Sequence, residues 1–178
     1  MTKRPKSRPA DAAKLDLGDY LPYLVNRVGT IIAEQFTAEA LAAHDLSIAM
    51  WRVLVVLAEN GGQRQIDLAG LTSIDVSTLS RLVTRLIRRG FVTRTRSRSS
   101  NREVVVALTA KAAATVRELV PVARQLEQTA TAGLAAGTIA GVKAALRRMY
   151  DNLGADGEPK IAAPARRRRV RKPKASGR

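Results

Sequence analysis

The feature that most constrains the fold is a change of hydrophobic period within residues 75–108. In the first half, apolar residues recur at the three- and four-residue spacing of an amphipathic helix. These residues are Leu79, Leu82, Val83 and Leu86. After Gly90, the segments 91–93 and 104–108 are rich in β-prone residues, and the polar stretch 94–102 separates them. The pattern therefore predicts a helix followed by a β-hairpin with a long tip.

Three further helices are predicted before this unit. Apolar spacing indicates a first helix over about 19–44, and Pro22 suits its first turn, where the missing N–H costs little. Ser47 is a suitable N-cap for a second helix that ends before Gly61. A short third helix is expected over about 64–71. The order of these elements places three helices directly before the hairpin-forming unit.

The remaining boundaries follow from capping and helix-breaking residues. Asp75 is a suitable N-cap for the fourth helix, and Gly90 is a suitable stop for it. Helical spacing resumes at Thr109 and continues, after a break within 133–137, into a last helix. Pro121 falls inside the fifth helix, so we expect this helix to be kinked or divided there.

Positive charge is concentrated in three parts of the chain. The net charge is +16, and residues 1–10 and 160–178 hold four and nine basic residues without an acid, which leaves +3 for residues 11–159. Eight arginines occur from Val76 to Arg102 without an intervening acid, and the rest of 11–159 is net negative, at −5. They are Arg81, Arg85, Arg88, Arg89, Arg94, Arg96, Arg98 and Arg102. This distribution indicates a phosphate-binding surface, and a merely solvated arginine-rich face is the alternative.

One face of the fourth helix is polar and lacks acids. It consists of Ser77, Thr78, Arg81, Thr84, Arg85 and Arg88. Short hydroxyl side chains followed by arginines one and two turns later suit a helix in the major groove of DNA. Simple solvation is the alternative, but exposed helices usually mix both signs of charge. The hairpin arginines would reach the adjacent minor groove or its phosphates. These are Arg94, Arg96, Arg98 and Arg102.

The sequence resembles the MarR family of bacterial winged helix-turn-helix transcriptional regulators. The segments 65–69 and 75–83 are similar to that family's third and fourth helices. The segments 86–94 and 104–109 are similar to the start of its wing and to the returning strand that ends in Leu-Thr. The order and spacing of these segments make the resemblance specific, and it covers roughly residues 19–154.

The wing departs from the family pattern at one position. The family commonly carries an Asp two residues before an Arg that touches the minor groove. Arg102 matches that Arg, but Ser100 occupies the Asp position. The resemblance therefore implies that Arg102 is held by Ser100 or Asn101, or is placed less rigidly than in relatives.

The resemblance and the periodicity together divide the chain into five parts. Residues 1–16 are expected to be a flexible basic arm, 17–46 an N-terminal dimerisation helix, and 47–109 the winged helix-turn-helix DNA-binding domain. Residues 110–154 would form C-terminal dimerisation helices, and 155–178 a disordered basic tail. The implied fold class is mainly α with a small β-hairpin wing, with dimerisation helices on both sides of the winged domain.

The resemblance implies a homodimer that binds double-stranded DNA at a pseudo-palindromic operator. The first, fifth and sixth helices are more apolar than a small winged domain requires, which favours pairing through them. A twofold dimer would place two recognition helices about 34 Å apart, on successive major grooves. Completion of a monomeric core is the alternative for these helices. An architectural protein without sequence preference is the alternative function.

Many members of the family release DNA when a small aromatic or acyl ligand binds between the winged domain and the dimerisation helices. The resemblance thus implies a ligand-responsive repressor. Candidate effector residues near the first two helices are Tyr20, Tyr23, Arg27, His44, Trp51 and Arg52. Arg27 lies within an apolar helix, where an anionic ligand would find a partner. A place in the core would also explain Trp51, and a helix cap or surface position would explain His44.

Composition argues against several other classes of protein. The chain has no cysteine, which excludes disulfides, thiolate metal sites and thiol redox switches, and the single His44 does not suffice for a multi-histidine zinc site. We find no phosphate-binding glycine loop or catalytic-triad signature, so no enzyme activity, cofactor or metal is expected. No secretory signal and no apolar run of about 20 residues is visible, so we expect a cytoplasmic protein without a membrane partner.

Overall fold

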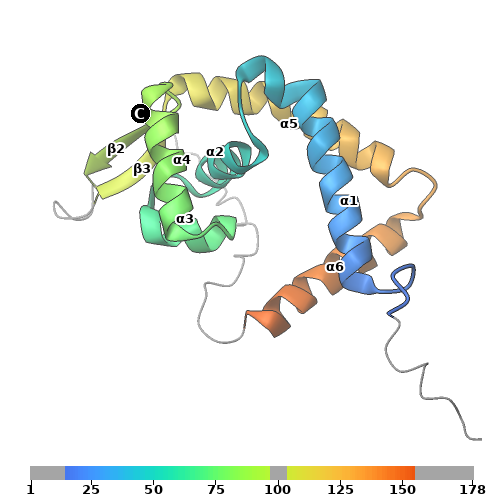
Figure 1. The fold of residues 1–178 in the computed structure, drawn as a ribbon. Coiled ribbons are helices and arrows are strands. Elements are labelled where there is room, and N and C mark those ends of the chain that lie inside the picture. The colour runs from blue at the N-terminus through green and yellow to red at the C-terminus, as the bar shows by residue number, and fades with distance from the viewer. Residues whose placement is uncertain (1–14, 97–103, 155–178) are drawn as a thin grey trace, which may run out of the picture.

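The structure, a computed structural model, describes residues 15–96 and 104–154. Its middle part combines short helices with a small antiparallel sheet, while long helices from both ends of the described chain lie together on the opposite side (Figure 1). This is the mainly helical architecture with a small β-wing that the sequence predicts.

The first helical segment is one rod built from three kinds of helix. Helix α1 (Leu21–Phe36) starts with proline in its first turn and continues into a π-helical turn, η1 (Thr37–Leu41), and a 3-10 turn, η2 (Ala42–His44). The rod ends at Asp45, whose backbone is left-handed, with φ of 49°. The predicted helix over 19–44 is therefore confirmed, although its last eight residues are not α-helical.

The next two helices form where the sequence predicts them, and the first of the two has the predicted N-cap. Helix α2 (Ile48–Asn60) starts at Ser47, whose Oγ accepts a hydrogen bond from Met50 N at 3.3 Å. Helix α3 (Gln65–Thr72) ends at Ser73, which is left-handed, with φ of 53°. This residue turns the chain toward the fourth helix.

Helix α4 (Val76–Arg88) forms the second half of the helix-turn-helix. The Oδ1 atom of its N-cap, Asp75, accepts from Thr78 N at 2.8 Å. Gly90 has φ of 71°, a left-handed conformation that favours glycine, and ends the helix where the sequence predicts. The apolar face of α4 is buried at Leu79, Val83 and Leu86.

The wing belongs to a sheet with strand order β1-β3-β2. Strands β2 (Val92–Arg96) and β3 (Val104–Leu108) form the predicted antiparallel hairpin. The sequence did not indicate β1 (Gln63–Arg64), which pairs with β3 through Gln63 opposite Val106. Two residues are too few to show the alternating pattern of a strand, so β1 can be recognised only from its pairing with β3.

Two helices complete the described chain. Helix α5 (Ala110–Ala130) contains Pro121 and continues through it, so of the two predicted alternatives, a kink or a division, the division is wrong. Gly133, with φ of 81°, lies in the turn that leads to α6 (Ala136–Leu153).

One hydrophobic core joins the rod, the helix-turn-helix and the sheet. Its largest fully buried side chains come from η1, α2, α3, α4, β2 and β3. They are Leu41, Met50, Val53, Leu54, Leu68, Leu79, Val83, Leu86, Val92 and Val106. Burial of this set fixes α4 against α2 and α3, and therefore holds its polar face outward.

The long helices α1 and α6 lie away from the hairpin (Figure 1), and both leave large apolar side chains exposed. These side chains include Leu21, Leu24, Val25, Val28 and Ile31 on α1, and Val142 and Leu146 on α6. In the described part of the chain, no residue of α6 is buried. No single described helix is both long enough and apolar enough to cross a membrane. The segments Leu21–His44 and Ile48–Asn60 reach that length and apolarity only when they are taken together, and the chain bends by 77° between them.

Candidate nucleic-acid interface and ligand cavity

The polar face of α4 is solvent-exposed and points away from the core. The predicted set, Ser77, Thr78, Arg81, Thr84, Arg85 and Arg88, falls within an arc of roughly 120° at 3.6 residues per turn. All of these residues are exposed except Thr78, which is half-buried. The structure thus brings the predicted helix residues together on one surface, opposite the buried Leu79 and Val83.

Hydrogen bonds organise the start of this surface. The hydroxyl of Ser77 donates to Asp75 Oδ1 at 2.7 Å, and the Thr78 N–H donates to the same atom. The Ser77 hydroxyl, followed by the backbone and side chain of Thr78, holds the pKa of Asp75 well below its usual range. Asp75 is therefore a permanent carboxylate at physiological pH, and the Ser77 oxygen faces outward as an acceptor.

The next turns present guanidinium groups. Arg81 Nη2 donates to Thr78 Oγ1 at 3.2 Å, which orients the arginine along the helix. The Thr84 hydroxyl donates to Ser80 O at 2.9 Å, so its proton is already used within the helix. The donors that this face offers to a partner are therefore chiefly arginine N–H groups, which match phosphate oxygens and the acceptors of guanine.

Arg89 is an exception among the arginines predicted to form the basic surface. Its side chain is only 22% exposed and lies against the end of the first rod, where Nη1 is 2.7 Å from Asp45 Oδ2 and Nη2 donates to His44 O at 2.9 Å. It also lies over the Phe91 ring. Arg89 is therefore not part of the basic surface, and its predicted place there is wrong. A count of charges along the sequence does not show that Asp45, an acid 44 residues away, binds this arginine.

The described part of the wing contributes one of the predicted arginines. Arg94 on β2 is exposed, and its Nη2 donates to Gln65 Oε1 at 3.4 Å, which connects the wing to the start of α3. Arg98, Ser100 and Arg102, together with the side chain of Arg96, lie outside the described residues. Their predicted roles in the minor groove stay predictions.

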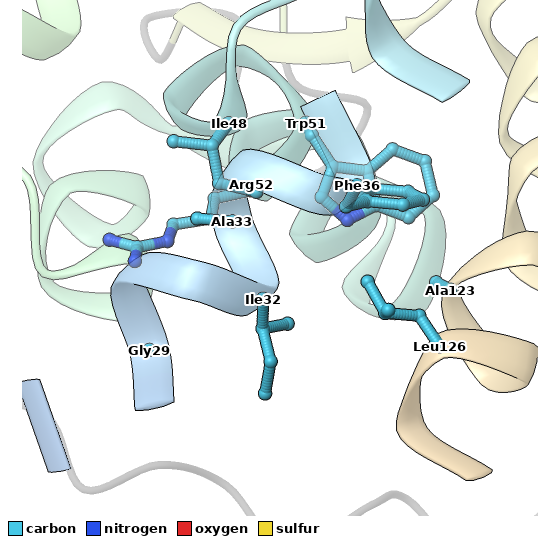
Figure 2. Close-up of a pocket in the computed structure, with 9 residues that line it drawn as sticks. All are labelled: Gly29, Ile32, Ala33, Phe36, Ile48, Trp51, Arg52, Ala123 and Leu126. Atoms are coloured by element: carbon cyan, nitrogen blue, oxygen red, sulfur yellow. The ribbon is translucent and has the colours of Figure 1, made fainter. Parts of the chain in front are cut away.

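A cavity of about 280 Å³ lies between the rod, α2 and α5. Figure 2 shows Trp51 and Phe36 on one side and Arg52 on the other. The remaining walls are apolar or small and come from Gly29, Ile32, Ala33, Ile48, Ala123 and Leu126. A smaller cavity, of about 180 Å³, shares Trp51 and Arg52 and reaches Leu71 and Thr72 at the end of α3. An apolar site with one guanidinium suits a small ring that carries an anionic group.

The predicted effector residues separate into two groups. Trp51 and Arg52 line the cavity. The other four are placed elsewhere in the structure. Tyr20 precedes α1, Arg27 stacks on the Tyr23 ring at 5.7 Å, and His44 Nε2 lies 3.5 Å from Glu118 Oε1.

The sequence does not distinguish the residues that form the apolar walls of the cavity. Phe36, Ile32 and Leu126 occur at ordinary helical spacing, so nothing in the sequence distinguishes them from core residues. Only the packing of α1, α2 and α5 shows that space remains between them. A signal for this cavity was present only in Arg52, a charged residue in an otherwise apolar stretch.

Comparison with known proteins places this geometry among transcriptional regulators. A model of the MarR family matches residues 46–104, which span α2 to the start of β3. The chain is similar to the HTH-type transcriptional repressor NicR of Pseudomonas putida, with 28% identity over 148 residues, covering 83% of this chain and 93% of that protein.

Two solved structures extend the likeness beyond the winged domain. A MarR-family regulator from Silicibacter pomeroyi is 28% identical, with a TM-score of 0.68, and the match covers 77% of this chain and 92% of that one. Bordetella bronchiseptica BpsR, whose DNA binding is regulated by 6-hydroxynicotinic acid, is 27% identical, with a TM-score of 0.64 and coverage of 73% and 98%. The fold is thus similar to that of solved transcriptional regulators over about three quarters of this chain.

Proposed function

Since the chain belongs to the MarR family and is a transcriptional regulator, we propose that it is a homodimeric repressor that binds a pseudo-palindromic operator and leaves it when a small anionic aromatic ligand binds. The observation that carries this proposal is the polar face of α4. Its own residues include Arg81, Arg85 and Arg88 and no acid, and the opposite face of the helix is buried in the core. These residues, with Ser77 and Thr84, would contact bases and phosphates in the major groove.

The exposed apolar face of α1 and α6 supports the homodimer. Val28 and Ile31 are more than half exposed, and Leu24 and Val142 also face solvent. Contiguous apolar surface of this kind marks protein interfaces rather than ordinary protein surface. A twofold pairing through these helices would put two copies of α4 on one side of the DNA, about 34 Å apart.

The cavity beside Trp51 supports the ligand. Its apolar walls suit a single ring, and Arg52 would bind a carboxylate attached to that ring. BpsR, with which this chain shares 27% identity, responds to 6-hydroxynicotinic acid, a six-membered ring with a carboxyl group. We therefore infer that the effector is an aromatic or heteroaromatic carboxylic acid, with an acyl derivative as the alternative.

Selection of binding sites from a random pool of duplex DNA tests the function. The full chain should enrich a pseudo-palindrome whose half-sites lie about one helical turn apart. Its affinity for that duplex should exceed its affinity for a scrambled duplex by about 1,000-fold or more, measured at one stated salt concentration. Similar affinities for the two duplexes would instead identify an architectural protein without sequence preference.

A further inference from the structure

The end of α4 is fastened to the end of the first rod. Arg89, the C-cap of α4, donates from Nη1 to Asp45 O and from Nη2 to His44 O. These carbonyls end the rod, where the helix dipole favours a cation. The Asp45 carboxylate adds an ion pair to the same guanidinium, with 2.7 Å between Nη1 and Oδ2.

The same carboxylate reaches the polar face of α4. Arg85 Nη2 lies 3.9 Å from Asp45 Oδ1, so one acid faces two arginines that are four residues apart at the end of the helix. Arg85 belongs to the proposed DNA-binding face, whereas Arg89 does not. Asp45 therefore connects a residue that binds the rod with a residue that would bind DNA.

The backbone conformation of Asp45 does not explain why this residue is an acid. Its φ of 49° and ψ of 40° are left-handed, a conformation in which glycine carries no steric penalty. Aspartate tolerates it better than most residues but gains nothing locally over glycine. Its side chain is 76% exposed and that of Arg85 is 54% exposed, so their ion pair contributes little to stability. What the carboxylate adds is the orientation of Arg85 and Arg89.

We propose that Asp45 is a positioning residue for sequence-specific DNA binding: it orients the Arg85 guanidinium and, through Arg89, fixes the last turn of α4 against the rod. The inference rests on the proposed function, because it requires a preferred DNA sequence. Asp45 itself would not touch bases, since a carboxylate repels the phosphates that flank the groove.

This role and two simpler ones predict different effects when Asp45 is replaced. If Asp45 only lowers the positive potential of the surface, its removal strengthens binding to every DNA sequence by the same factor. If Asp45 only stabilises the fold, its removal lowers the melting temperature and leaves both affinities unchanged. A positioning role lowers the affinity for the preferred duplex relative to a scrambled one.

The experiment measures both affinities of the full chain by fluorescence anisotropy, using the duplex that the wild-type chain selects and a scrambled duplex of the same composition. The variants are Asp45→Asn and Asp45→Gly, with Glu39→Gln as a control that removes one exposed acid from the same rod. We expect the ratio of the two affinities to fall about five- to tenfold in both Asp45 variants and to stay unchanged in the control. Asp45→Gly should keep or raise the melting temperature because glycine suits the left-handed backbone.

A double-mutant cycle tests the route through Arg85. If Asp45 acts by orienting that guanidinium, Asp45→Asn combined with Arg85→Gln should lose little more specificity than Arg85→Gln alone. Additive losses of specificity in the double variant would overturn the inference, provided that the wild-type chain prefers one duplex. An affinity ratio that stays unchanged in the Asp45 variants, because neither affinity changes or both change equally, would overturn it as well. Failure of the wild-type chain to select any duplex would instead overturn the proposed function, and this inference with it.

Discussion

The Phe36 ring meets the Trp51 indole edge-on, with ring centroids 5.2 Å apart and an angle of 64° between the planes. This contact joins α1 to α2 at the wall of the cavity that Trp51 and Arg52 line. Trp51 is the only tryptophan in the chain, so its fluorescence reports on this wall alone. The protein therefore carries an intrinsic probe beside the proposed effector site.

We expect 6-hydroxynicotinic acid to change Trp51 emission in a saturable way, after correction for absorption by the ligand. Arg52→Ala should weaken this binding about 10- to 100-fold, because it removes the cation that would bind the carboxylate. Arg27→Ala is the matched control, since Arg27 is an exposed arginine on α1 that stacks on Tyr23 outside the cavity. Loss of binding in Arg27→Ala but not in Arg52→Ala would place the ligand elsewhere.

Replacement of Arg81 should change sequence preference rather than affinity alone. Arg81→Ala is expected to cost about 1–3 kcal/mol of binding at one position in each half-site, because one bidentate contact to a base would be lost. Binding-site selection with the variant should show relaxed preference at that position. Arg147→Ala, which removes the same charge from exposed α6, should leave the preference intact. Equal weakening on all sequences would make Arg81 a phosphate contact.

A charge in the exposed apolar face of α1 should prevent pairing. Val28→Glu is expected to shift the chain from dimer to monomer in sedimentation velocity, because a carboxylate would be buried without a partner at the interface. DNA affinity should fall with it, since two linked copies bind far better than one. Asn26→Glu adds the same charge to an exposed position outside this face and should remain dimeric. A dimer that persists in Val28→Glu would assign pairing to another surface.

The basic residues in 160–178 are expected to add phosphate contacts without sequence preference. Each phosphate contact contributes about 0.9 to the slope of log affinity against log salt concentration. Replacing the nine basic residues with serine and glutamine should therefore flatten the slope, while the ratio of specific to non-specific affinity stays nearly constant. This substitution keeps the chain length and so separates charge from truncation. A collapse of the ratio would mean that this segment contributes to sequence recognition.

Thr109 connects the sheet to α5 through its hydroxyl group. The Oγ1 atom accepts from Ala112 N at 3.2 Å as the N-cap, and it donates to Gly90 O at 2.8 Å. Thr109→Ala should lower the free energy of unfolding by about 0.5–2 kcal/mol, measured by urea denaturation, because a helix cap is lost. Thr109→Ser keeps the hydroxyl and should recover most of that loss. Equal destabilisation by both variants would assign the effect to the lost methyl group.

Local signals explain most of what the sequence predicted correctly. Ser47, Asp75 and Gly90 act within a few residues of their own position, and the structure shows each one capping or ending the predicted helix. The amphipathic pattern of α4 also predicts the orientation of the helix, because burial of Leu79 and Val83 requires the arginines to face outward. These features depend on short-range spacing and are therefore visible in one sequence.

The features that the sequence did not predict depend on contacts between distant segments. Asp45 meets Arg89 across 44 residues, so the count of arginines did not show that this one is bound within the protein. Strand β1 exists only because Gln63 and Arg64 lie beside β3. The cavity is enclosed by three helices whose residues look like core in sequence. Each of these requires the tertiary arrangement before it can be recognised.

The wide π-helical turn after Phe36 sets the angular offset between the two halves of the first rod. Residues before it present the exposed apolar face of α1, while Ala40 and Leu41 within it are buried in the core. Deleting one residue from this turn would rotate one half by about 100° relative to the other. Because Phe36 and Ile32 on α1 also pack into the core, a change of one residue in length would either turn these two side chains out of the core or turn the proposed dimer surface to a new direction relative to the winged domain.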